Sequence, residues 1–449
     1  MQNVQKGRNQ MSFFLHGVHV PHRKNTADQS AARIAPVTTV TLPMSMHIGA
    51  PAVPTVRVGD TVGVGTKIAD GVGAVSSPIH ASVSGKVTKI SDILLSSGNT
   101  VPAVTIESDG EMTPDASLQA PVINSREDLL AAMKDSGVVG LGGAGFPTYV
   151  KWSADPARME DLIINGAECE PYITSDSLTM IERADDMEFA LRTILQYFPI
   201  KRVIIGIESN KPAAIASMKE MAAKIEGAEV CVLPQLYPQG GEKVLVYHTT
   251  RKEIPAGKLP IDVGCVVCNC TTIAAIGTYL KTGMPLVEKC ITVDGGCVAN
   301  PQNLIVPIGT SLEDVFAFCG GLKIEPSKVL NGGPMMGGTV PALKVPVLKN
   351  TNAVIALTEK ESRLPKTTAC IRCGACTNVC PLGLAPAQIL LAYKKKDADM
   401  LNALSVESCM LCGCCSFNCP ANRPLVQTNS LSKQLLKEKK AKETSKNGK

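Results

Sequence analysis

The sequence predicts a multidomain chain that combines β and α/β architecture with a helical, cysteine-rich C-terminal part. Three observations support this prediction. Residues 37–108 are rich in Val, Gly and Pro with short alternating runs, residues 125–283 alternate strand and helix signals, and one cysteine spacing occurs twice near the C-terminus. A length of 449 residues allows about three or four domains, and a hydrophobic content of 45% supports packed cores.

The β-rich region contains two related half-motifs, Val58–Gly65 and Ser77–Val87. Together they resemble the flattened barrel, or barrel-sandwich hybrid, of biotinyl and lipoyl domains. Those domains carry a modified lysine on the hairpin between the halves, but Ala69–Val75 contains no lysine here. The resemblance therefore implies the fold without the carrier function. We place this domain at 37–115, after an N-terminal arm at 1–36.

The next region, 116–284, predicts a Rossmann-like α/β domain. Ser125 with Asp128 should cap its first helix, and Asp176 should cap a long helix that ends near Phe198. The expected strands are 161–165, 203–207 and 229–233, and the expected helices are 125–135, 176–198 and 211–226. Alternating strands and helices indicate a parallel sheet with right-handed crossovers.

Residues 285–345 lose the helical period and predict a small β-grasp-like domain. Strands are expected at 286–293 and 303–307, and Thr310 or Ser311 should cap a helix at 312–318. Residues 346–366 read as a linker. They lead into a cysteine-rich domain at 367–430, with a helix at 387–395, and a lysine-rich tail at 431–449.

Both cysteine runs have the spacing C-x2-C-x2-C-x3-C-P, which is the bacterial two-cluster ferredoxin pattern. In that pattern the fourth cysteine of each run binds the other cluster. The sequence thus predicts a ferredoxin-type domain with two 4Fe–4S clusters. Cluster 1 is assigned Cys370, Cys373, Cys376 and Cys419, and cluster 2 is assigned Cys409, Cys412, Cys415 and Cys380. Zinc suits two ligand pairs around one ion better than twin triads with a distant fourth cysteine.

Four further cysteines leave alternatives open. Cys414 lies out of phase in the second run and is either a bystander or an alternative ligand to Cys415. Cys265, Cys268 and Cys270 are either buried apolar residues or the ligands of an extra metal.

A glycine-rich loop precedes the first α/β strand. Gly140, Gly142, Gly143 and Gly145 permit close backbone approach to a ligand, and their N–H groups can form a nest for a phosphate. Lys151 adds a positive charge nearby. On its own the loop is also consistent with a structural turn.

Three more segments carry ligand-binding residue types: Asn165–Pro171, Tyr237–Lys243 and Cys268–Thr272. The first follows a predicted strand, where ligands of open α/β sheets bind.

The four segments, in this order, resemble the flavoprotein subunit of respiratory complex I, in which they bind FMN and NADH in one cleft. Leu141 replaces an arginine of that pattern and Ala167 replaces an aspartate. The barrel, the glycine loop and the double cysteine run together resemble the RnfC family. Its members belong to the Rnf complex, an ion-translocating ferredoxin:NAD oxidoreductase of bacterial membranes.

The resemblance implies two cofactor sites besides the clusters, and no catalytic residue beyond the cofactors. Backbone of the four glycines would line the FMN phosphate, with Lys151 compensating its charge. Phe146 would pack on a ring. Asn165 and Asn269 would bond flavin polar groups, and Thr271 or Thr272 the ribityl chain or phosphate. Glu168, Glu170 and Glu242 would accept from NAD(H) hydroxyls. The assigned cofactor-binding set also includes Thr148, Asp176 and Lys243.

The resulting hypothesis is a peripheral NAD(H)–FMN–iron–sulfur electron-transfer subunit on the cytoplasmic face of a bacterial membrane complex. The resemblance implies other subunits of an ion-translocating complex as partners, with ferredoxin reached through a partner subunit. Two alternatives remain: a soluble subunit of a hydrogenase-like complex, and a non-enzymatic iron–sulfur adapter.

Composition limits other functions. Net charge is only +5, no nucleic-acid module is recognisable, and no run of about 20 apolar residues predicts a membrane span. The tail carries seven lysines against two glutamates. It reads as a disordered segment or as a contact for an acidic leaflet or partner.

Overall fold

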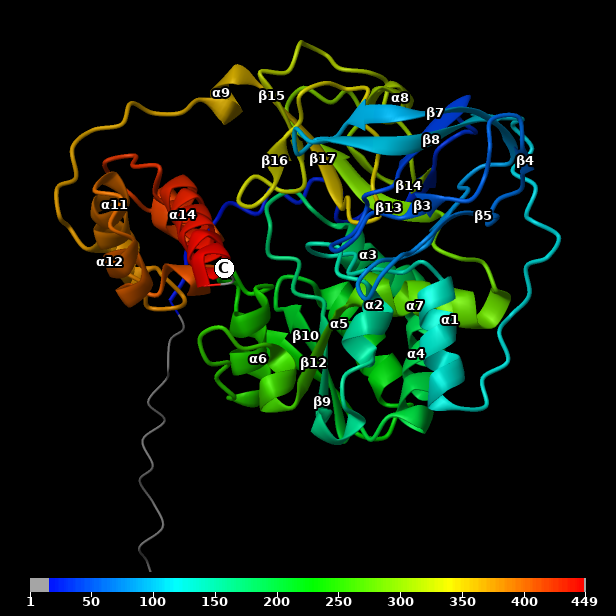
Figure 1. Cartoon of the computed structure of the whole chain (residues 1–449), viewed down its shortest axis with the longest axis horizontal. Coiled ribbons are helices and arrows are strands. Elements are labelled where there is room, and N and C mark those ends of the chain that lie inside the picture. The colour runs from blue at the N-terminus through cyan, green and yellow to red at the C-terminus, as the bar shows by residue number, and fades with distance from the viewer. Residues whose placement is uncertain (1–15, 448–449) are drawn as a thin grey trace, which may run out of the picture. The chain divides into compact units, whose positions relative to one another are not determined.

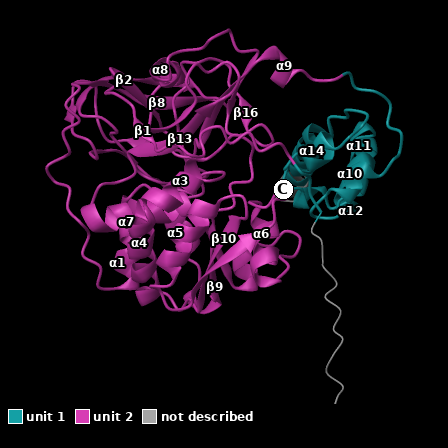
Figure 2. Cartoon of the chain, turned by 180° about the vertical axis from the view of Figure 1, so that it is seen from behind, with its two compact units in different colours: residues 1–19, 366–449 teal, residues 20–365 magenta. Residues whose placement is uncertain are grey.

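The computed structural model describes residues 16–447, with side chains up to residue 442. The chain forms two compact units, Val20–Pro365 and Met1–His19 with Lys366–Lys449 (Figure 2). Within the described residues, no helix combines the length and apolarity needed to cross a bilayer.

The β-rich region of the larger unit folds into two antiparallel sheets, as the barrel-sandwich prediction requires. One sheet has the order β2-β8-β7-β4 and the other the order β3-β5-β6 (Figure 1). Alternate residues such as Val40, Leu42 and Ile106 are fully buried between them. The strands are β2 Thr39–Pro43, β3 Val53–Pro54, β4 Thr61–Val62, β5 Lys67–Asp70, β6 Ile79–His80, β7 Gly85–Leu94 and β8 Thr100–Ser108.

The α/β region is built on a parallel sheet in the order β11-β10-β9-β12. Its strands are β9 Asp161–Asn165, β10 Arg202–Glu208, β11 Ala228–Leu233 and β12 Cys265–Asn269. The parallel sheet and the first three strands confirm the prediction. β12 was not predicted.

Helices cover both faces of this sheet, and the strand residues alternate between them (Figure 1). Ile163 packs with Leu245 of α6, whereas Leu162 and Ile164 pack toward α4 and α7. The helices are α1 Arg126–Asp135, α2 Thr148–Trp152, α3 Ser175–Glu182, α4 Ala184–Tyr197, α5 Pro212–Ala222, α6 Glu242–Thr250 and α7 Cys270–Thr282.

Two helix predictions in this region are corrected. The long helix expected from Asp176 breaks at Arg183, whose backbone leaves the helical region and whose side chain donates to the Ala274 carbonyl of α7. Asp176 lies inside α3 and caps nothing; Thr174 is the N-cap residue. By contrast, Ser125 accepts from the Asp128 amide and caps α1, as predicted.

The third region forms a six-stranded mixed sheet in the order β1-β14-β13-β17-β15-β16. Its elements are β1 Ala32–Arg33, β13 Glu288–Asp294, β14 Gln302–Pro307, α8 Leu312–Phe318, β15 Lys328–Asn331, β16 Gly338–Thr339, β17 Ala353–Leu357 and α9 Glu359–Ser362. Ser311 caps α8, as expected.

The predicted linker at 346–366 is wrong. It contains β17, a fully buried strand that pairs with both β13 and β15. The short apolar run Ala353–Leu357 completes the sheet because its backbone groups find partners on both sides.

Several contacts fix the barrel strands and loops to the rest of the larger unit. The Ile48 amide donates to the Gly145 carbonyl at 3.0 Å, and the Ser82 hydroxyl donates to the Ile308 carbonyl. The buried Lys349 ammonium donates to the carbonyls of Pro78 at 2.6 Å and Gly137 at 2.7 Å.

The cysteine-rich region of the smaller unit is helical. Its helices are α10 Ala375–Asn378, α11 Pro386–Lys394, α12 Ala398–Ala403, α13 Cys414–Phe417 and α14 Leu425–Asn447. The lysine-rich residues 431–447 continue α14, so the reading of this stretch as a disordered tail is corrected.

Candidate flavin, nucleotide and iron–sulfur sites

The glycine loop is closed at its base. The Gly140 amide donates to the Phe146 carbonyl at 2.8 Å, and Gly145 adopts a φ of +74°, which favours glycine. The Leu141 amide donates to the Thr272 hydroxyl at 3.0 Å, which ties the loop to α7. Gly142 and Gly143 are exposed, so their backbone is accessible to a ligand.

Asn269 organises the N-terminus of α7 beside this loop. Its side-chain oxygen accepts from the amides of Thr271 and Thr272 at 2.9 and 3.3 Å, and its amide donates to Asp176 at 2.7 Å. Thr271 donates to the second oxygen of Asp176 at 2.7 Å. A Cβ on Gly142 would lie 2.3 Å from the Asn269 side-chain nitrogen, so only glycine fits this approach.

Asn165 and Asn269 lie at the same edge of the sheet because they are register partners at the ends of β9 and β12. Asn165 donates to the Gly240 carbonyl at 2.9 Å. The Gly240 amide in turn donates to the Cys169 sulfur at 3.3 Å. The segments at Asn165, Gly240 and Asn269, distant in sequence, therefore meet at the carboxyl ends of the parallel strands.

Glu168 turns away from the role expected for a free acceptor. It has a φ of +45°, and its carboxylate accepts from the Asp176 amide and the Ser177 hydroxyl, both at 2.6 Å. It therefore closes the start of α3. Burial raises the pKa of Glu168.

Lys24 of the N-terminal arm holds the same acidic loop. Its ammonium donates to the carbonyls of Glu168 at 2.9 Å, Glu170 at 2.8 Å and Ile173. Nothing in the sequence near Lys24 signals this role, because the contact is far from local.

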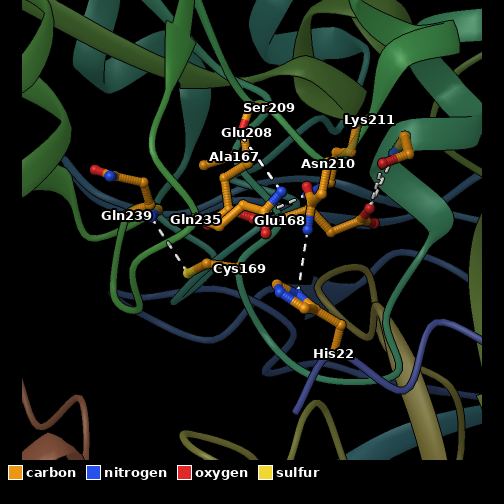
Figure 3. A network of polar contacts seen from close by, with 12 residues as sticks. His22, Ala167, Glu168, Cys169, Glu208, Ser209, Asn210, Lys211, Gln235 and Gln239 are labelled. Carbon is orange, nitrogen blue, oxygen red and sulfur yellow. Dashed lines mark hydrogen bonds and ion pairs between the residues drawn. The ribbon is translucent and has the colours of Figure 1, made fainter. Parts of the chain in front are cut away.

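A polar network lies around this loop (Figure 3). Buried Lys211 donates to Glu208 and Asn210, both at 3.0 Å, and Asn210 lies 3.1 Å from a ring nitrogen of His22. The arm residue His22 thus joins the polar groups that follow β10.

Glu170 faces the glycine cluster of residues 332–338. Its carboxylate accepts from the amides of Met335 at 3.0 Å and Met336 at 2.8 Å. Burial is the largest influence and raises the pKa of Glu170 to about 7. This residue therefore joins the acidic loop to the six-stranded sheet region.

The other predicted cofactor residues differ in accessibility. Lys151, one third exposed, donates to the Val267 carbonyl and lies 4.0 Å from exposed Glu242 at the start of α6. Lys243 and Phe146 are half-buried. Thr148 begins α2 and is only 3% exposed, which places its side chain in the interior.

The two cysteine runs repeat their backbone geometry. Arg372 and Gly374 have φ values of +58° and +76°, and Leu411 and Gly413, at equivalent positions, have +59° and +85°. Such turns direct successive N–H groups into a concavity that suits anions, including iron–sulfur clusters. A four-residue helix follows each turn.

The cysteines assigned to cluster 2 surround a single cavity. Cys380, Cys409, Cys412 and Cys415 all line it, and so does Cys414. The Leu384 amide donates to the Cys380 sulfur at 3.3 Å. Such donors suit thiolate ligands because hydrogen bonds to sulfur stabilise the charge and tune the cluster. These donor groups fit the predicted cluster.

Cysteines of the two runs also pack together around cluster 1. Cys376 of the first run belongs to one packed group with Cys415, and half-buried Cys419 packs against it. Cys370 and Cys373 are exposed. The pairing of Cys376 with Cys419 is the one that the exchanged fourth ligand requires.

Cys265, Cys268 and Cys270 do not converge. Cys265 packs with the α6 face of the sheet, whereas Cys268 and Cys270 pack on the opposite side. Burial raises the pKa of all three thiols, which keeps them neutral. In residues 16–447, no three His, Cys, Asp or Glu side chains gather as closely as a single metal ion needs.

Comparison with known proteins matches three families along the chain. Residues 133–278 match the Nuo51 FMN-binding domain, residues 12–111 match the RnfC barrel sandwich hybrid domain, and residues 290–338 match the SLBB domain.

Similar whole proteins carry closely related names. The chain is 40% identical over 383 residues, 84% of this chain and 86% of the relative, to the C-subunit of the Na+-translocating ferredoxin:NAD+ oxidoreductase complex of Acetobacterium woodii. It is 39% identical to the proton-translocating counterpart of Clostridium ljungdahlii, covering 86% of this chain and 85% of that protein. It is 38% identical to the equivalent component of the ion-translocating oxidoreductase complex of Rhodobacter capsulatus, covering 95% and 83%. With these identities across most of its length, the chain belongs to the RnfC family of the ion-translocating ferredoxin:NAD+ oxidoreductase complexes.

Proposed function

We propose that this protein is the NAD(H)-linked electron-transfer subunit of an ion-translocating ferredoxin:NAD+ oxidoreductase complex, with FMN and two 4Fe–4S clusters as resident cofactors. One observation carries the proposal. The accessible glycine loop, the N-terminus of α7 and the polar strand ends meet at one edge of a sheet, in a chain that also carries the duplicated cysteine turns.

The glycine loop and α7 hold the FMN. Amides of Gly142 and Gly143 are accessible, and the N-terminal dipole of the 13-residue helix α7 favours an anion nearby. Asn165 and Asn269 orient polar ring or ribityl groups, with Thr271 and Thr272 behind them. A Cβ on Gly142 would clash with Asn269, so the loop and the start of α7 approach each other closely.

The nicotinamide nucleotide lies toward the acidic loop and α6. Glu242 is exposed at the first position of α6, with Lys151 at 4.0 Å, and both are available to ribose or phosphate groups. Glu168 and Glu170 contribute by shaping the loop, because their carboxylates are already committed to backbone amides. This revises their expected direct contact with NAD(H).

The duplicated cysteine runs hold the clusters in the exchanged arrangement. Cys370, Cys373, Cys376 and Cys419 bind one, and Cys409, Cys412, Cys415 and Cys380 bind the other. The Asn429 amide, 3.3 Å from the Cys409 sulfur, donates to that ligand. A bound flavin exchanges electron pairs with nicotinamide and single electrons with iron–sulfur clusters.

The partners and location follow the same proposal. The protein is a peripheral component at the cytoplasmic face of the membrane, bound to integral subunits that move ions. Ferredoxin delivers electrons through a partner subunit. The names of the relatives support an assembly of this kind.

Anaerobic purification, cofactor counting and NADH titration test the proposal. We expect about eight irons and one FMN per chain, with flavin absorbance that bleaches on addition of NADH. Protein that carries iron and sulfide but neither binds FMN nor responds to NADH would identify it as an iron–sulfur adapter and refute the proposal.

A further inference from the structure

Lys289 of β13 directs a buried cation at the glycine loop from outside the α/β region. Its side chain is 2% exposed, and its ammonium donates to the Leu141 carbonyl at 3.4 Å. Leu141 directly precedes Gly142 and Gly143, whose backbone is accessible. The charge therefore lies beside the surface assigned to FMN.

The Lys289 ammonium is poorly satisfied compared with other buried lysines of the same unit. An ammonium carries three donors. Lys349 donates to two carbonyls and a hydroxyl, Lys24 donates to three carbonyls, and Lys211 pairs with Glu208 and Asn210. Lys289 has one long hydrogen bond and forms no ion pair with any residue that the structure describes.

Nearby Asp176 does not fill this gap. It attracts Lys289 electrostatically, but its two oxygens accept from Asn269 and Thr271. Burial is the dominant influence and lowers the pKa of Lys289. A buried cation with one weak hydrogen bond is costly, and no contact within the fold offsets that cost.

We propose that Lys289 recognises the phosphate of FMN, so that it determines the preference of this site for FMN over riboflavin. The inference rests on the proposed FMN site. A phosphate above Gly142 and Gly143 would supply the anionic acceptors that Lys289 lacks. Lys151, the residue expected in this role from the sequence, already donates to Val267 and lies near Glu242.

Paired titrations of FMN and riboflavin on the full-length, cluster-loaded protein test the inference. Flavin fluorescence quenching gives both dissociation constants for the native protein, Lys289→Met and the control Lys151→Met. Charge-assisted hydrogen bonds of this kind correspond to an affinity change of about ten- to a hundredfold. We expect Lys289→Met to weaken FMN by that factor and leave riboflavin nearly unchanged, whereas Lys151→Met keeps the preference for FMN.

Methionine has a similar length and suits a buried site, and thermal unfolding with the cluster absorbance checks that the variant folds. If it does not fold, the same titrations on Lys289→Gln decide the question. Equal weakening of both flavins, or a preference for FMN that survives, would overturn the role of Lys289. Native protein that binds FMN and riboflavin equally would also overturn it. Native protein that binds neither flavin would instead refute the FMN site itself.

Discussion

The closest backbone approach at the flavin site predicts a sharp difference between two neighbouring glycines. A Cβ on Gly142 would lie 2.3 Å from the Asn269 side-chain nitrogen and 2.7 Å from its carbonyl carbon. Asn269 cannot withdraw freely because it is bonded to the amides of Thr271 and Thr272 and to Asp176. At Gly143, an added Cβ would meet no atom within 4 Å.

The cost of Gly142→Ala follows from these contacts. Overpacking costs about 1–3 kcal/mol, and displacing the Asn269 cap of α7 adds about 1 kcal/mol. We therefore expect the free energy of unfolding to fall by about 2–4 kcal/mol, which lowers Tm by roughly 5–15 °C. Because Asn269 also belongs to the proposed FMN site, FMN affinity should fall by about tenfold or more.

Thermal unfolding and FMN fluorescence titration measure both effects, with Gly143→Ala as the matched control. The control should leave Tm within about 1–2 °C of the native value, since surface substitutions rarely exceed about 0.5 kcal/mol. The reasoning would be refuted if Gly142→Ala matched the native protein in Tm and FMN affinity, or if Gly143→Ala were the less stable variant.

Three further predictions concern other sites. Cys380→Ala should reduce iron from about eight to about four atoms per chain, whereas Cys414→Ala should keep about eight; halved iron in the Cys414 variant would make it a ligand. Burial raises the pKa of Glu170 from 4.5 to about 7, so the native state retains a proton that the unfolded chain releases between these values, and stability should fall as pH rises from 4.5 to 7. Glu170→Gln should flatten this slope in urea unfolding, and an unchanged slope would contradict the assignment. Lys24→Met should cost about 1–3 kcal/mol by leaving three carbonyls without their donor, and amide exchange in residues 168–174 should accelerate; unaltered exchange would show that Lys24 does not hold the loop.

Elements with strong local signals were predictable from the sequence. Asp161–Asn165 is an apolar run bounded by polar residues and forms β9 with the expected limits. Ser125 and Ser311 each precede an acidic residue by three positions, and both cap their helices. The regular cysteine spacing could be read without any tertiary information.

Elements decided by tertiary contacts were not predictable. β12 was missed because Cys265–Asn269 continues directly into α7 without a turn residue. β17 lies in a segment that looked like a linker, since its five residues become a strand only between β13 and β15. Likewise, Lys24 and Lys289 reach carbonyls more than a hundred residues away, which local patterns cannot reveal.

The sandwich of short strands near the N-terminus has a consequence for its evolution. Domains of this shape that shuttle a group between active centres must swing freely on a tether. Here Ile48, Ser82 and the bonds from Lys349 anchor it at separate points. A lysine grafted onto the hairpin at residues 71–75 would therefore create an attachment point without a moving arm. The ancestral vehicle has become a fixed wall of the larger unit.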